Sequence, residues 1–113
     1  MNLDQIIELI DGEILIANEN PIEYDSAFAS DLMSDVLRWH CDNMILITGL
    51  ATIQTIRTAE LSGIYCVILA RGKKVSDEML EIAGESDIAI LTSPKSMFEI
   101  SGILYQEGIK PLY

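Results

Sequence analysis

Three short stretches of the sequence decide the fold. Residues 44–50 read MILITGL, residues 65–74 read YCVILARGKK, and residues 88–96 read IAILTSPKS. Each stretch is an apolar run that ends in a polar turn, and a helical pattern of apolar residues follows it. We predict strands at 44–47, 65–70 and 88–91. Strand, turn and helix recur about every 22 residues, a spacing that favours a parallel sheet with right-handed crossovers.

The helices after these strands have recognisable ends. Gly63 closes the first helix, Ser76 caps the start of the second, and Gly108 closes the third. Because the strands are continuous apolar runs, helices are expected on both faces of the sheet. With 113 residues and 50% hydrophobic content, the chain fits a single domain over residues 1–113. The predicted fold class is α/β, with a mostly parallel sheet flanked by helices.

The N-terminal part carries the same kinds of signal in shorter form. Leu3, Ile6, Ile7 and Ile10 are spaced as on one face of a helix, and Gly12 follows as a stop signal. The predicted elements are a helix at 2–10, strands at 13–17 and 22–29, and a helix that Ser30 caps and that ends near Cys41.

The charge balance excludes one large class of partners. The formal net charge is −11 at pH 7, whereas nucleic-acid binding depends on clustered Lys and Arg, so we expect no nucleic acid. The apolar runs are far shorter than the roughly 20 residues that cross a bilayer, and the N-terminus shows no secretory signal. We therefore expect no membrane partner and a cytoplasmic location. Cys41 and Cys66 lack a C-x-x-C spacing and are expected to be reduced and buried.

Positive charge is concentrated in one part of this acidic chain. Every charged residue up to Asp35 is acidic, which makes the acidic N-terminal half a candidate docking surface. Residues 44–75 contain four basic residues and one acidic residue, namely Arg57, Arg71, Lys73 and Lys74 against Glu60. A local basic zone is therefore expected inside an acidic protein.

The turns after the three strands are the candidate ligand site. In open parallel sheets, ligands bind beyond the carboxyl ends of the strands. Hydroxyls, glycines, positive charges and helix N-termini meet there and favour an anion. The candidate ligand-binding residues are Thr48, Gly49, Thr52, Arg57, Arg71, Lys73, Ser93 and Ser96. The alternative is that these residues serve only as tight turns and helix caps.

The sequence lacks the motifs of nucleotide-binding, metal-binding and catalytic sites. The Gly72-Lys73 pair has Val67 where a P-loop requires its first glycine, and no Gly-x-Gly-x-x-Gly pattern is present. His40 adjoins Cys41, but adjacent helical residues point in different directions and no second cluster supplies further ligands. We expect no catalytic residues, no cofactor and no metal, and thus a protein that is not an enzyme.

Two acidic pairs recur four positions apart. Ser30-Asp31 and Ser34-Asp35 would line one face of the predicted helix. This face is either a cap followed by a solvated surface, or a surface for a partner or subunit. Like charges at this spacing are mildly unfavourable, so a basic group nearby would compensate for them. Arg71 and Lys73 of this or another subunit are candidates.

Several segments together resemble the DRTGG domain family, over nearly the whole chain. They are residues 30–37, residues 47–50 with Gln54 and residues 57–60, residues 71–73, and residues 97–99 with residues 102–105. The chain looks most like the short stand-alone members, whose fold is similar to the N-terminal domain of HPr kinase/phosphorylase. Related domains accompany CBS pairs and phosphotransacetylases, and stand-alone forms neighbour redox and signalling genes. The resemblance implies a regulatory or ligand-sensing role and no kinase activity.

One departure from the family pattern affects the site. Thr48 and Gly49 fit the start of the family's loop, but Leu50 and Ala51 stand where Asp-Arg is expected. Ligand contacts made by that pair in other members cannot be carried over to this chain.

Two hypotheses for function remain open. The first is a non-catalytic regulatory domain that binds a small phosphate- or nucleotide-like anion, or a partner protein, through the turns. The alternative is an interaction subunit of a redox or signalling system that has no small ligand and docks through its acidic N-terminal part. A homodimer is expected, with Trp39, Tyr65 and Tyr105 available to an interface.

Overall fold

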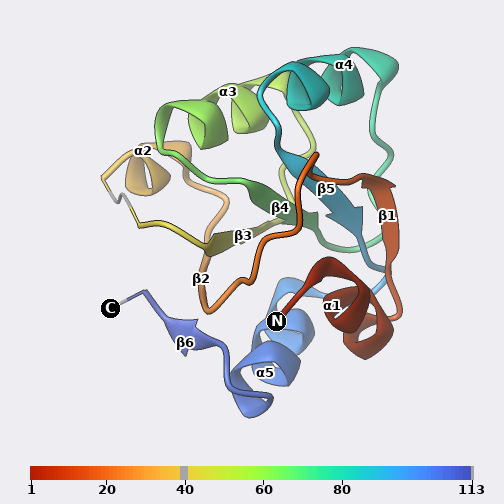
Figure 1. Ribbon diagram of the computed structural model, residues 1–113, viewed down its shortest axis with the longest axis vertical. Helices are drawn as coiled ribbons and strands as arrows, with labels where there is room; N and C mark the ends of the chain where they lie inside the picture. The colour runs from red at the N-terminus through yellow and green to blue at the C-terminus, as the bar shows by residue number, and fades with distance from the viewer. Residues whose placement is uncertain (39–40, 113) are drawn as a thin grey trace.

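The computed structural model describes residues 1–38 and 41–112. In this part of the chain, six strands form one sheet with the order β1-β5-β4-β3-β2-β6 (Figure 1). The strands are β1 (Glu13–Ile16), β2 (Ser26–Ala29), β3 (Met44–Thr48), β4 (Cys66–Leu69), β5 (Ala89–Thr92) and β6 (Lys110–Pro111). The helices are α1 (Leu3–Ile10), α2 (Met33–Val36), α3 (Ile53–Leu61), α4 (Asp77–Glu85) and α5 (Met97–Gln106).

The sheet is parallel except at one edge. Strands β5, β4, β3, β2 and β6 are parallel neighbours, while β1 pairs with β5 in the antiparallel direction. The predicted fold class, a mostly parallel sheet flanked by helices, is therefore confirmed. Strand β6 was not predicted; its backbone hydrogen bonds, such as Lys110 N–H to the Asp25 carbonyl at 3.0 Å, attach the C-terminal segment beside β2.

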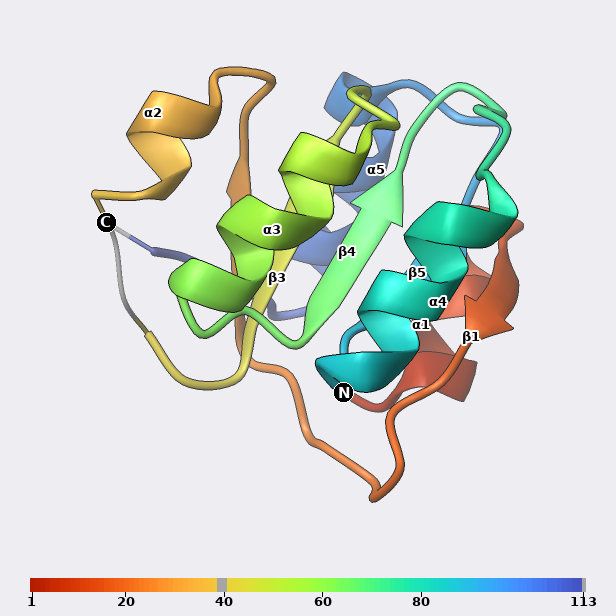
Figure 2. The ribbon, with the colours of Figure 1, turned by 90° about the horizontal axis from the view of Figure 1, so that it is seen from above.

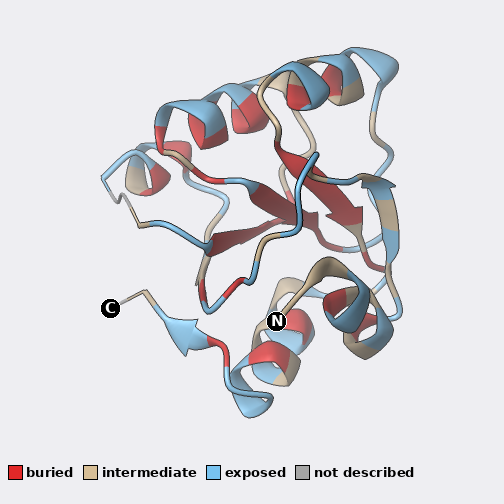
Figure 3. Ribbon diagram, in the orientation of Figure 1, coloured by how far each residue is buried: buried red, intermediate tan, exposed pale blue. Residues whose placement is uncertain are grey.

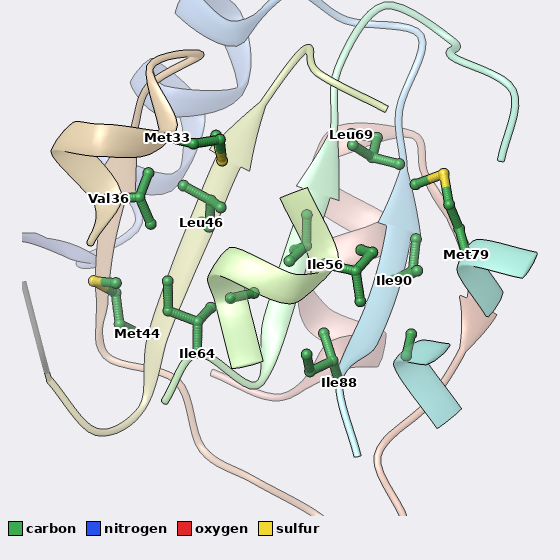
Figure 4. Packing of buried hydrophobic residues seen from close by; sticks show 13 residues of the cluster. Met33, Val36, Met44, Leu46, Ile56, Ile64, Leu69, Met79, Ile88 and Ile90 are labelled. Carbon is green, nitrogen blue, oxygen red and sulfur yellow. The ribbon is translucent and has the colours of Figure 1, made fainter. Parts of the chain in front are cut away.

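Helices cover both faces of the sheet. Helices α2, α3 and α4 lie on one face, and α1 and α5 lie on the other (Figures 1 and 2). Every residue of β3 and β4 is buried, as Figure 3 shows for the centre of the sheet. Side chains from the sheet and the three helices above it form a continuous apolar cluster (Figure 4). This two-sided burial is the physical reason for the continuous apolar runs in the sequence.

Side-chain caps begin four of the helices. The Asn2 side chain accepts a hydrogen bond from the backbone N–H of Gln5, and Thr52, Ser76 and Ser96 cap α3, α4 and α5 in the same way. Each cap satisfies a backbone donor that has no partner within the helix. The predicted cap at Ser76 is confirmed.

The helix expected from Ser30 to near Cys41 is wrong in its start and its length. Helix α2 covers only Met33–Val36, and Leu32 stands at its N-cap without a side-chain hydrogen bond. Ser30 instead accepts from the N–H of Leu32, in a local turn. Strand β2 is also shorter than expected, because it begins at Ser26 and not near residue 22. The expectations for Trp39 and His40 lie outside the described residues.

The two cysteines differ in burial. Cys66 is fully buried in β4 and Cys41 is only partly buried, so the expectation of burial is wrong for Cys41. Cys41 follows the shortened helix in a loop, where the protein covers it incompletely. Both thiols are free. No helix in residues 1–38 and 41–112 has the length and apolar character to cross a membrane.

We predict that a thiol reagent labels the native protein at Cys41 and not at Cys66. Burial raises the pKa of the Cys66 thiol and shields it from reagent. In a reaction with Ellman's reagent, one thiol per chain should react before urea is added and the second only on unfolding. A Cys41→Ser variant should lose the native reaction. Equal rates for both thiols in the native protein would contradict this assignment.

Candidate functional site

The turns that follow β3, β4 and β5 are joined by backbone hydrogen bonds. The N–H of Ala70 donates to the Thr48 carbonyl at 2.9 Å, the N–H of Arg71 to the Lys95 carbonyl at 2.9 Å, and the N–H of Gly72 to the Ser93 carbonyl at 2.8 Å. Arg71 and Gly72 both have positive φ, 65° and 63°, which turns the chain sharply after β4. The three turns therefore form one continuous surface, which we call the carboxyl edge.

A carboxylate of this chain occupies the β3 turn. Asp31 Oδ1 accepts from the backbone N–H of Gly49 at 2.7 Å and from the Thr48 hydroxyl at 2.8 Å. Asp31 follows β2, and β2 is the parallel neighbour of β3, so sheet pairing brings the two loops together. The Gly49 hydrogen bond, the Thr48 hydroxyl and the charges of Arg71 and Lys73 lower the pKa of Asp31. The turn thus binds an anionic oxygen.

The Arg71 side chain lies against Gly49. A β-carbon added at Gly49 would stand 2.7 Å from Arg71 Nη2, so the absence of a side chain at Gly49 makes room for the guanidinium. Arg71 and Lys73 are exposed. Within residues 1–38 and 41–112, no side-chain hydrogen bond or ion pair holds either cation. Both charges therefore remain available at the carboxyl edge, beside the Asp31 carboxylate.

The polar side chains of the β5 turn bind other groups of this protein. The buried Ser93 hydroxyl donates to the Ile10 carbonyl at 2.6 Å and accepts from the N–H of Lys95. The Lys95 ammonium lies 3.3 Å from Asp11 and 3.5 Å from Glu99. The hydrogen bond to Asp11 and the charge of Glu99 raise the pKa of Lys95. These residues join the end of α1 to the start of α5.

The structure separates the eight candidate residues into three groups. Thr48, Gly49 and Arg71 meet at the β3 turn, and Lys73 acts there through its charge. Thr52 and Ser96 cap helices, as the alternative of tight turns and helix caps predicted. Ser93 binds the end of α1 through its hydrogen bond to the Ile10 carbonyl. Arg57 is exposed on α3, and no hydrogen bond among the described residues joins it to the edge. Ligand binding by the eight residues stays a prediction.

Asp31 does not lie where it was predicted. The predicted helix face shared with Asp35 is wrong, because Asp31 precedes α2 and reaches across to β3. Arg71 and Lys73 of this chain, two of the expected compensating groups, lie near enough for their charges to lower the pKa of Asp31. Leu50 and Ala51, which stand at the family's Asp-Arg positions, pack against the apolar core. No cluster of three or more metal-ligating side chains occurs in the described parts of the chain.

The fold and this edge define an α/β domain with a candidate anion-binding edge. The model of the DRTGG domain matches residues 5–106, and the chain therefore belongs to the DRTGG domain family. Comparison with curated proteins finds no match.

A solved structure shares the fold. It is the crystal structure of the CBS and DRTGG domains of the regulatory region of Clostridium perfringens pyrophosphatase, complexed with its activator, diadenosine tetraphosphate. The TM-score is 0.76 at 20% identity, over 95% of this chain and 47% of that chain. This chain thus spans about half the length of the chain it resembles. At this identity the likeness shows the fold.

Proposed function

We propose that this protein is a non-catalytic regulatory domain that binds a small phosphate- or nucleotide-like anion at the carboxyl edge. The observation that carries the proposal is the contact of the Asp31 carboxylate with Gly49 N–H and the Thr48 hydroxyl. The same donors, with Arg71 and Lys73 beside them, suit a phosphate oxygen. Membership of the DRTGG domain family and the regulatory region of similar fold support this role.

A ligand at this edge would compete with Asp31. The turn donors are already used by the carboxylate, while the Arg71 and Lys73 side chains are not. A phosphate that bound the two cations and took over the turn donors would release residues 30–32. Helix α2 follows directly and has only four residues, too few to be stable by itself. Ligand binding would therefore change the position or order of α2, which is the regulatory output.

We predict that Arg71→Ala weakens anion binding by about tenfold. One charge-assisted contact to a phosphate is worth about 1.5–3 kcal/mol, and tenfold corresponds to about 1.4 kcal/mol. Asp31→Asn should instead tighten binding, because it removes a negative charge and a competitor. Isothermal titration with pyrophosphate, ATP and diadenosine tetraphosphate measures both effects.

The matched control is Lys110→Ala. Lys110 also carries one positive charge, but it stands at the start of β6, opposite the first residue of β2, at the other end of the sheet. Its loss changes the net charge equally without touching the carboxyl edge. No binding of any of the three probes at millimolar concentration would exclude the site. Equal affinities in the Arg71→Ala and Lys110→Ala variants would place binding elsewhere.

The acidic N-terminal part supports a second candidate function. Asp4, Glu8, Glu19 and Asp25 are exposed, and no ion pair among the described residues involves them, so a basic partner protein would meet a negative surface. In this version the cytoplasmic protein is an interaction subunit of a redox or signalling system, without a small ligand. Pull-down from native extract at rising salt tests it, because screening should release such a partner. A partner retained at high salt would contradict electrostatic docking.

A further inference from the structure

Helix α5 leaves two large aromatic side chains in solvent. Phe98 is 90% exposed and Tyr105 is 68% exposed. Phe98, Ser101, Gly102 and Tyr105 stand at helical positions i, i+3, i+4 and i+7, so they form one stripe along the helix. We call these four residues the α5 stripe. The stripe carries no charge, although the protein has a net charge of −11.

An apolar hollow adjoins the α5 stripe. It has a volume of about 130 Å³, and its lining includes Ala27 and Ala29 of β2, Ile47 of β3, and Ser101 and Tyr105 of α5. On this face of the sheet, α5 packs on β3 and α1 packs on β1 (Figure 1). The hollow therefore marks sheet surface beyond α5. An apolar cavity of about 150 Å³ holds a benzene molecule, so the hollow has the size of one aromatic ring.

We propose that the α5 stripe and the hollow form an interface with a second copy of this chain. The midpoint of the stripe falls between Ser101 and Gly102, and Phe98 and Tyr105 are equally far from it. Two antiparallel α5 helices related by a two-fold axis at this midpoint place Phe98 of each copy opposite Tyr105 of the other. Phe98 then enters the hollow beside that tyrosine. Gly102 has open space around it, which lets the two backbones approach closely.

The aromatic residues supply a large part of the area that such an interface needs. Buried aromatic side chains contribute about 150–250 Å² each. Phe98 and Tyr105 of both copies together would bury up to about 600–1,000 Å², against the roughly 1,000 Å² of a specific interface. Most of this area is exposed in the single chain.

The α5 stripe matches a second copy of itself in polarity. Lys95, just before the helix, is already paired with Asp11 and Glu99 of its own chain. The four stripe residues themselves are uncharged. A second copy presents the same uncharged surface. A strongly acidic or basic partner would find no counter-charge on the stripe itself.

The oligomeric state of the full chain tests the proposal. Sedimentation equilibrium between about 5 and 300 µM should show a dimer for the wild type. Phe98→Glu should raise the dimer dissociation constant by about 30-fold or more, as loss of a central aromatic anchor does. Leu61→Glu is the matched control, because Leu61 is 76% exposed on α3, on the other face of the sheet. This variant should remain a dimer.

A cross-link tests the position of the two-fold axis. In a Cys41→Ser background, Gly102→Cys should form a disulfide-linked dimer under mild oxidation, because position 102 lies next to the axis. Glu81→Cys, exposed on α4, should not. A wild-type monomer at all concentrations would overturn the proposal, and so would a Phe98→Glu dimer of undiminished affinity. Urea unfolding of monomeric Phe98→Glu should match that of the wild type at low concentration, because the side chain is solvent-exposed.

Discussion

Replacing Leu46 with alanine is expected to lower the free energy of unfolding by about 3 kcal/mol. Leu46 lies in β3 and its side chain is fully buried. It belongs to an apolar cluster with side chains of the sheet and of helices α2, α3 and α4, and Figure 4 shows it beside Met33 and Val36 of α2. Alanine leaves a cavity that neighbours fixed to several elements cannot fill. Urea unfolding followed by circular dichroism measures the loss, at one protein concentration because dimerisation adds to apparent stability.

Leu61→Ala provides the control with the same chemical change. Leu61 is 76% exposed near the end of α3, so its truncation should change the free energy of unfolding by no more than about 0.5 kcal/mol. A similar loss in both variants would mean that the core is not placed as described. The comparison tests the effect of burial, because the same atoms are removed from a buried and from an exposed leucine.

Asp31→Ala is expected to lower the free energy of unfolding by about 1–2 kcal/mol. It removes hydrogen bonds to Thr48 and Gly49, both of which are buried. Buried donors left without a partner cost about 1–3 kcal/mol, and solvent at the exposed Asp31 position reduces that cost. Asp35→Ala removes the same side chain from the following helix and should cost less than about 0.5 kcal/mol.

The contribution of Asp31 depends on pH. Its pKa is lowered in the folded protein, so its stabilisation is present above the unfolded pKa of about 3.9. The stabilisation is lost as the pH falls through the lower, folded pKa. The difference in stability between wild type and Asp31→Asn should therefore be greatest near neutral pH and should shrink below about pH 4. Urea unfolding at pH 7, 5, 4 and 3 measures this trend. A difference that grows as the pH falls would contradict the assignment.

The carboxyl edge could be predicted only in part. Strand ends, glycines and basic residues in the turns indicated where the edge lies, because these signals are local. The contacts of Ser93 with Ile10 and of Asp31 with Gly49 join residues far apart in sequence. Such contacts depend on strand order, which the local patterns do not specify. Consequently the prediction did not separate the caps Thr52 and Ser96 from the donors at the β3 turn.

The helices and strands could also be predicted only where local sequence patterns specify them. Long apolar runs, the cap at Ser76 and the closing glycines Gly63 and Gly108 predicted β3, β4, β5 and the helices after them, since each pattern reflects burial or the backbone preferences of neighbouring residues. Helix α2 was predicted to begin too early, because Asp31 is held by the β3 turn. Strand β6 has only two residues, too short for a periodic pattern, and exists through its hydrogen bonds to the β2 segment.

The sequence alone determined the α/β class, the central strands, the positions of the turns that follow them, the helix cap at Ser76 and the family resemblance. These follow from local apolar periodicity and from residue types with specific backbone preferences. Only the tertiary structure decided that Asp31 occupies the β3 turn, that Arg71 lies against Gly49, that Phe98 is exposed, and that Tyr105 lines an apolar hollow. Those features arise where separate strands and helices meet, so they depend on how the elements pack.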